Sequence, residues 1–190
     1  MKIKHAQKLK PRSKRSKKQM GWTLIEYLVT FAAVAGLAAY AFAKMGDNTE
    51  TRKIETAKTV LADGAEKIRT RYRSWGNYSN VTNTSCYQGK IFPSDWLSAT
   101  ADQFTTPFSD NGLTCGSVNT ATDLDGNTSS GTGKYFTFTL SNLTRSQCDY
   151  LVNELVRQFT EVQIGTDRVD SNLVVESKCV DGVSVTFIGR

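Results

Sequence analysis

The sequence predicts an α+β protein, in which a long N-terminal helix packs on a C-terminal globular domain with an antiparallel β-sheet. Three observations predict this class. No proline occurs between residues 22 and 74, a stretch that is apolar in its first part and amphipathic in its second. Segments with strand-like alternation follow only after residue 134. All four cysteines lie beyond residue 85, as expected for a separate disulfide-bonded domain.

Residues 1–21 form a basic leader with nine Lys or Arg and no acidic residue. The whole chain carries a net charge of +6, but the remaining 15 basic residues are outnumbered by 18 acidic ones. A basic arm for nucleic acid is the general alternative for such a run. The apolar segment that follows instead favours positive charge that holds an N-terminus in the cytoplasm, so we expect no direct nucleic-acid partner.

Residues 22–43 are predicted to be a transmembrane helix segment, because 27–43 contains no charged residue. Glu26 directly precedes this uncharged run, at its N-terminal end. A carboxylate deep in a membrane costs about 2.5 kcal/mol or more, so we expect Glu26 to have a partner. Residues 44–75 continue the helix as an amphipathic segment, whose apolar residues recur at spacings of three and four: Ile54, Ala57, Leu61, Ala65, Ile68, Tyr72 and Trp75.

Residues 76–190 are predicted to be the globular domain. The polar, turn-rich stretch 76–85 ends the long helix. The elements expected after it are a short helix in 94–104 with Ser94 as N-cap, mostly loop over 110–133, a strand at 135–141, a helix at 144–159, and strands at 161–164, 172–177 and 183–188.

The four cysteines, an even number beyond an export signal, indicate two disulfides in an oxidising compartment. Three pairings are possible. We favour the sequential one, which joins Cys86 to Cys115 and Cys148 to Cys179, but the sequence leaves the other two open.

The chemistry of an enzyme is missing. The only histidine, His5, lies in the leader, which removes the usual Ser-His-Asp and Cys-His arrangements and zinc-ligand spacing. The stretch DLDGN (123–127) has two acids and a glycine but lacks further ligands of a calcium loop, so we interpret it as a surface turn. We therefore expect that the protein is not an enzyme and that it binds no metal ion and no cofactor.

The stretch GWTLIE (21–26) combines the end of a basic leader, a cleavable glycine, a large apolar residue and a glutamate. It resembles the class III signal peptide of type IV prepilins. The resemblance implies that a membrane prepilin peptidase cuts after Gly21, so that Trp22 begins the mature chain. The leader length, the Trp22 start and a Cys148–Cys179 bond are similar to the type IVb branch, and the resemblance covers residues 1 to about 75 best.

The resemblance further implies a structural subunit like the major pilins of enteric adhesive or conjugative thin pili. Such a subunit is first held in the bacterial inner membrane, with its leader in the cytoplasm and its C-terminal domain in the periplasm. The pilus assembly machinery then polymerises it with other pilin subunits into an extracellular filament. There Glu26 would pair with the positive α-amino group of a neighbouring subunit and set the register of assembly.

Two alternatives stay open. The first is a minor pilin or a type II secretion pseudopilin. The second is a soluble secreted binding protein, released by cleavage of the AFA site at 41–43. Against the second, the apolar run exceeds the usual 7–15 residues of a signal peptide, and Glu26 would have no purpose in a discarded segment.

We predict that Gly21→Val blocks processing, because a branched side chain replaces a residue without Cβ at the peptide bond to be cut. Membrane fractions of this variant should contain the 21.0 kDa precursor, detected by immunoblot. Protein of mature size would contradict cleavage at this position.

Overall fold

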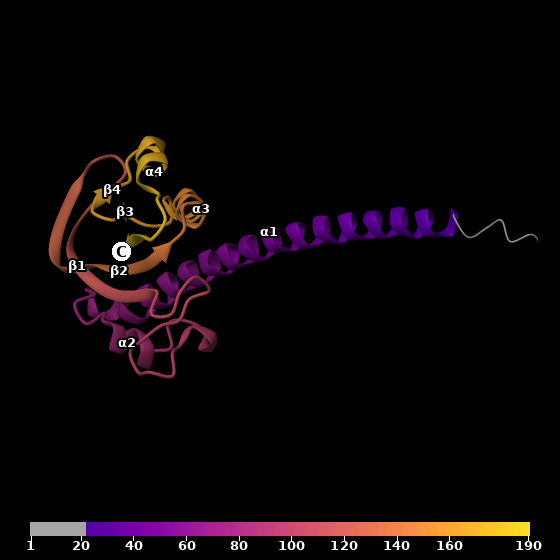
Figure 1. Ribbon diagram of the computed structural model, residues 1–190. Helices are drawn as coiled ribbons and strands as arrows, with labels where there is room; N and C mark the ends of the chain where they lie inside the picture. The colour runs from indigo at the N-terminus through magenta and orange to yellow at the C-terminus, as the bar shows by residue number, and fades with distance from the viewer. Residues whose placement is uncertain (1–21) are drawn as a thin grey trace, which may run out of the picture. The chain divides into compact units, whose positions relative to one another are not determined.

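The computed structural model describes the backbone of residues 22–190, with the side chains of all but 22–24 and 41–48. The chain divides into two compact units at Asp47/Asn48. One helix, α1 (Trp22–Tyr72), belongs to both units (Figure 1). The prediction of a long helix from Trp22 to about Ser74 is therefore confirmed.

The end of α1 follows from local chemistry. A short 3-10 helix, η1 (Arg73–Trp75), succeeds the last α-helical turn. Gly76 then takes a left-handed conformation with φ of 70°, which a residue without Cβ adopts at little cost. Arg69 and Arg71 lie in the last turn of α1, where positive charge complements the helix dipole.

The second unit contains a five-stranded antiparallel sheet in the order β1-β2-β5-β3-β4. Its strands are β1 (Leu113–Thr122), β2 (Thr128–Leu143), β3 (Glu161–Ile164), β4 (Asp167–Arg168) and β5 (Val183–Gly189). The C-terminal strand β5 lies between β2 and β3, so the sheet is complete only when the end of the chain has been inserted. The predicted strands at 135–141, 161–164 and 183–188 are confirmed.

One face of the sheet is covered by the second part of α1. The side chains of Ala57, Leu61 and Ile68 are fully buried, together with Phe138 and Phe187 of the sheet. Burying an apolar side chain of this size contributes about 1.5–3 kcal/mol. The apolar stripe of the sequence between residues 54 and 68 is thus the surface on which the domain is built.

The two flanks of α1 are covered by different elements. On one flank lies α3 (Arg145–Leu155), whose N-cap Thr144 forms a capping box with Gln147. On the other flank lies the segment that follows α2 (Asn83–Gln88), where the ring of Phe92 packs against Gly64. A Cβ at residue 64 would lie 2.9 Å from that ring, so a larger side chain would force the segment away.

Two predictions for the middle of the domain are wrong. Residues 110–133 are mostly strand and not loop, because β1 and the start of β2 pair as a hairpin despite their polar composition. The DLDGN stretch is the turn of this hairpin, with Gly126 at φ of 86°. Residues 94–104 hold only the 3-10 helix η2 (Ser94–Trp96), in which Pro93 and not Ser94 occupies the N-cap position. Bridges of Phe104 to Leu97 and Leu113 replace the rest of the expected helix.

The prediction of a strand at 172–177 is also wrong, because this segment is the helix α4 (Asn172–Lys178). Leu173 and Val175 would share a face in a strand, yet Leu173 is 75 % exposed and Val175 is 2 % exposed. A short run of β-branched residues does not distinguish strand from helix, and here packing of Val175 into the core decides.

Both disulfides of the sequential pairing are present. Cys86–Cys115 joins α2 to β1 with its Cα atoms 6.5 Å apart, and Cys148–Cys179 joins α3 to the end of α4 with its Cα atoms 5.6 Å apart. The bonds close sequence separations of 29 and 31 residues. Each therefore connects a helix to a part of the domain that is distant along the chain.

We predict that non-reducing peptide mapping of the purified protein will yield the 86–115 and 148–179 cross-linked peptides. Each closed loop should stabilise the domain by roughly 3–4 kcal/mol, because it restricts the unfolded chain. A peptide that joins Cys115 to Cys148 would refute the sequential pairing.

Candidate assembly site

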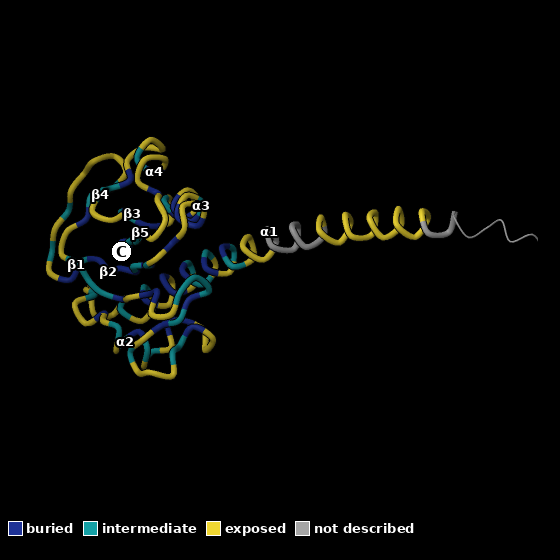
Figure 2. The backbone as a smooth tube through the Cα atoms, viewed as in Figure 1, coloured by how far each residue is buried: buried dark blue, intermediate teal, exposed yellow. Residues whose placement is uncertain are grey.

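The first unit presents an apolar helical surface that nothing in the described chain covers. Every side chain from Ile25 to Tyr40 is exposed (Figure 2). Its large apolar members are between 63 % and 79 % exposed: Ile25, Tyr27, Leu28, Val29, Phe31, Val34, Leu37 and Tyr40. Soluble monomers rarely expose a contiguous apolar surface of this extent, so this segment requires apolar cover from a partner.

Within the part of the chain that the structure describes, no helix has both the length and the apolar character needed to cross a membrane.

Glu26 is the one charged residue of this apolar surface. It lies in the second turn of α1, one turn beyond the N-terminal end of the helix. Its backbone oxygen accepts a 2.8 Å hydrogen bond from the Thr30 hydroxyl, but its carboxylate makes no hydrogen bond or ion pair with any described residue. The carboxylate is therefore available to a group outside these residues.

The other residues predicted for processing lie at the edge of the structure. Trp22 is the first residue of α1, and its side chain lies outside the description. Gly21 and the leader lie outside the described residues altogether.

Polar contacts in the second unit fix α3 beside α1. Glu50 accepts hydrogen bonds from Lys53 at 2.7 Å and from Gln147 at 3.0 Å, and these bonds lower the pKa of its carboxyl group. The hydroxyl of Tyr150 donates to the Glu55 carboxylate, which raises the pKa of the phenol. These side chains link α1 to α3, which lies nearly a hundred residues later in the sequence. They hold α3 on one flank of α1.

A further interhelical bond is an ion pair. The Lys58 ammonium group lies 2.6 Å from the Glu154 carboxylate, which raises the pKa of the lysine. Both side chains are partly exposed, so this pair orients α3 more than it stabilises the fold.

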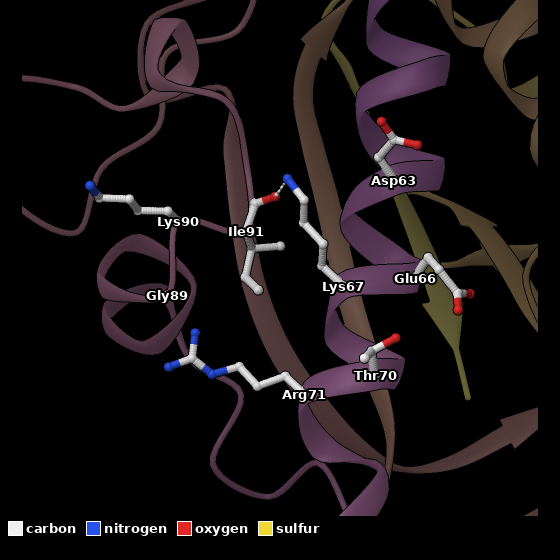
Figure 3. Close-up of a pocket in the computed structure, with 8 residues that line it drawn as sticks. All are labelled: Asp63, Glu66, Lys67, Thr70, Arg71, Gly89, Lys90 and Ile91. Carbon is white, nitrogen blue, oxygen red and sulfur yellow. Dashed lines mark hydrogen bonds between the residues drawn. The ribbon is translucent and has the colours of Figure 1, made fainter.

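The clefts of the second unit contain no catalytic arrangement that we can identify. Figure 3 shows a cleft of about 560 Å³ beside α1, in which Lys67 and Arg71 extend toward Gly89 and Ile91. Lys67 donates to the Ile91 carbonyl at 3.1 Å, which fixes the loop beside α1. Among the described residues, no group of three or more His, Cys, Asp or Glu side chains could hold a metal ion.

Comparison with solved structures identifies the fold. The chain is similar to the crystal structure of TcpA, a type IV pilin from Vibrio cholerae El Tor biotype, with a TM-score of 0.52 and 18% sequence identity. The match covers 73% of this chain and 99% of the TcpA chain. No protein-family model matches the sequence, and no curated protein sequence matches it.

The class that the architecture defines is therefore the type IV pilin fold, an α+β fold with a long N-terminal helix and an antiparallel sheet. At this level of identity the likeness establishes the fold, and the predicted fold class is confirmed. Glu26, the candidate assembly residue, is identified by the sequence motif alone. It lies on the exposed apolar part of α1 and does not line a cleft.

We predict that Glu50→Gln removes a small part of the stability at neutral pH. The folded-state pKa of Glu50 lies below its usual 4.5, so its contribution is present above that value and is lost as the pH falls through the folded-state pKa. Because the side chain is 50% exposed, we expect a loss of only about 0.2–1 kcal/mol at pH 7 and a smaller loss as the pH falls toward 2.

Urea unfolding of the full chain in detergent measures this difference at both pH values. Glu66→Gln is the matched control, since Glu66 is on the same helix and lies 3.9 Å from its basic neighbour Arg69 without a hydrogen bond. An equal loss from Glu50→Gln at both pH values would contradict a role for the carboxylate charge.

Proposed function

We propose that this protein is the structural subunit of a type IVb pilus. The observation that carries this proposal is the combination of a pilin fold with an N-terminal helix whose residues 25–40 are all exposed and apolar apart from Glu26 and Thr30. A domain that buries its own core completely but leaves one helical segment bare has a surface suited to assembly with other copies.

The proposed route begins at the inner membrane. Residues 22–43 anchor the subunit in lipid, the basic leader 1–21 stays in the cytoplasm, and the domain formed by 44–75 and 76–190 lies in the periplasm. Prepilin peptidase cuts after Gly21, and the apolar segment then passes from lipid into the core of the filament. The two environments are both apolar, which is why one segment can serve in each.

Glu26 sets the register of the filament in this proposal. Cleavage leaves a positive α-amino group on Trp22, and the carboxylate of a neighbouring subunit can pair with it in the helical bundle. A subunit added at the wrong height would leave both charges buried without partners. The absence of any partner for this carboxylate among the described residues supports a partner in another subunit.

The assembled filament would serve adhesion or conjugative cell contact at the bacterial surface. Its partners are other copies of the chain and the pilus assembly machinery. It needs no cofactor, and it is not an enzyme.

A secreted protein released after Ala43 is the main alternative, and the course of α1 argues against it. The helix continues through Ala43 and Lys44 to Tyr72, so this cut would fall inside a helix and not in an extended segment. The mass of the mature N-terminus separates the two routes, because it begins at Trp22 in the first and at Lys44 in the second. A minor pilin or pseudopilin would share the Trp22 start and would differ in its abundance in purified filaments.

We predict that Glu26→Ala leaves export and cleavage largely intact but abolishes or severely reduces filaments. The peptidase acts on the bond before Trp22, and removal of the charge eases insertion of the apolar segment. In assembly, the uncompensated α-amino group costs about 3–5 kcal/mol, a factor of several hundred or more at each addition step.

Electron microscopy of sheared surface fractions, beside an immunoblot of membranes, measures both outcomes. Glu26→Gln should fail like Glu26→Ala because it retains the shape without the charge, whereas Glu26→Asp should retain some filaments. Abundant normal fibres from both uncharged variants would mean that Glu26 has no part in assembly.

A further inference from the structure

A basic cleft lies at the C-terminal end of α1. Its volume is about 340 Å³, at the lower end of the range for small-molecule sites. Its lining comes from α1, from the turn that follows it, from β2 and from the C-terminus: Arg69, Tyr72, Arg73, Gly76, Asn77, Tyr78, Lys134 and Arg190. Four of these eight residues are basic and none has an acidic side chain.

The basic residues of this cleft differ in how far they are already engaged. Arg69 is a structural brace, because it donates to an α-carboxylate oxygen of Arg190 at 2.7 Å and to the Gln158 carbonyl at 3.2 Å, and its guanidinium also lies 3.9 Å from the Glu66 carboxylate. Lys134 donates to the Ser129 hydroxyl. The guanidinium groups of Arg73 and Arg190 form no hydrogen bond or ion pair with any described residue. Two cations are thus free to bind an anion beside two that hold the cleft in shape.

Several basic residues elsewhere in residues 49–190 face acidic partners. Such pairs are Lys53–Glu50, Lys58–Glu154 and Lys178–Asp167, with N–O distances of 2.6–2.9 Å. Positive charge gathered in a concave site without acidic side chains raises the local concentration of anions. The electrostatic character of the cleft therefore points to an anionic ligand.

An exposed tryptophan adjoins the cleft in the chain. Trp75 is 66 % exposed, and among residues 49–190 it is the only aromatic residue in the set of large exposed apolar side chains. It directly precedes Gly76 and Asn77 of the cleft, and its carbonyl oxygen accepts a hydrogen bond from the Asn77 side chain at 3.4 Å. The Trp75 ring is not part of the cleft lining, but an exposed indole next in the chain to two cleft residues suits a ligand that extends from the cleft and has both an apolar face and a negative charge.

We propose that this cleft binds an acidic saccharide, with its carboxylate or sulfate on Arg73 and Arg190 and a sugar ring on Trp75. The Asn77 amide supplies a polar group of the kind that sugar hydroxyls bind. Single-stranded nucleic acid fits less well, because it is held by successive aromatic platforms along a basic groove, whereas here the cleft is short and Trp75 is the one exposed aromatic residue next to it in the chain. The site is formed within one chain, so it does not depend on polymerisation.

The test uses the full chain in a polyoxyethylene detergent, titrated by calorimetry with a heparin-derived tetrasaccharide. Arg73→Gln and Arg190→Gln should each weaken binding by about tenfold and reduce its dependence on salt, since each removes a charge-assisted contact. Trp75→Ala should weaken binding on the order of fivefold and leave the salt dependence unchanged.

Arg52→Gln is the matched control, because it removes one exposed positive charge from α1 at about 25 Å from Arg69, the nearest cleft residue on that helix, by the 1.5 Å rise per residue. It should bind like the unchanged protein, and maltotetraose, which is neutral, should not bind. Thermal unfolding by circular dichroism verifies that each variant is folded.

Three results would overturn the proposal. Loss of affinity in Arg52→Gln equal to that in Arg73→Gln would show that only net charge matters. Equal affinity for a single-stranded hexathymidylate would assign the cleft to nucleic acid. If inorganic sulfate saturated the cleft at the same concentration as the tetrasaccharide, the sugar ring would contribute nothing to binding.

Discussion

The buried face of α1 between Ile54 and Ile68 is the contact on which the rest of the domain depends. The sheet, α3 and the loop after α2 all bury apolar side chains in the same core as this face. Small residues shape it as much as large ones do, because Gly64 admits the ring of Phe92 and Ala57 has no exposed surface. Loss of this face would leave the sheet with an apolar side and nothing to cover it.

The same helix carries two different patterns of apolar residues. Residues 25–40 are apolar around most of the circumference, whereas residues 54–68 are apolar on one stripe and charged on the other side. The chain itself covers the stripe and leaves the all-round segment exposed. A helix that is apolar all round is stable only inside protein or lipid, so the sequence of α1 defines both a domain core and a surface for partners.

Periodicity in the sequence predicts the elements whose burial is regular, and it fails where burial is slight or ambiguous. The helical stripe of α1 and the alternation in β5 were sufficient to predict both elements. The hairpin of β1 and β2 was missed, because outside the main core it buries only a small cluster around Ala121, and its threonines and serines look like loop. In α4 the valines fit either structure, and tertiary packing of Val175 decided.

The two proposed sites differ in how sequence can reveal them. Glu26 is found from local sequence alone, because one charge interrupts an apolar run. The basic cleft could not be found in this way, since Arg73 and Arg190 are separated by more than a hundred residues and meet only when β5 is inserted in the sheet. No spacing rule connects Arg73 with Arg190.

In the proposed filament, the contrast between apolar packing and a single charge would define what Glu26 contributes. The segment AAVAGLAA (32–39) offers small side chains, and sliding two such helices by one residue changes their height by only 1.5 Å. Hydrophobic burial is non-directional and distinguishes poorly between such neighbouring positions. A carboxylate that must meet one amino group distinguishes them strongly, because every other height leaves a charge buried without a partner. In a bundle of these helices, apolar residues would thus supply the cohesion and Glu26 the specificity.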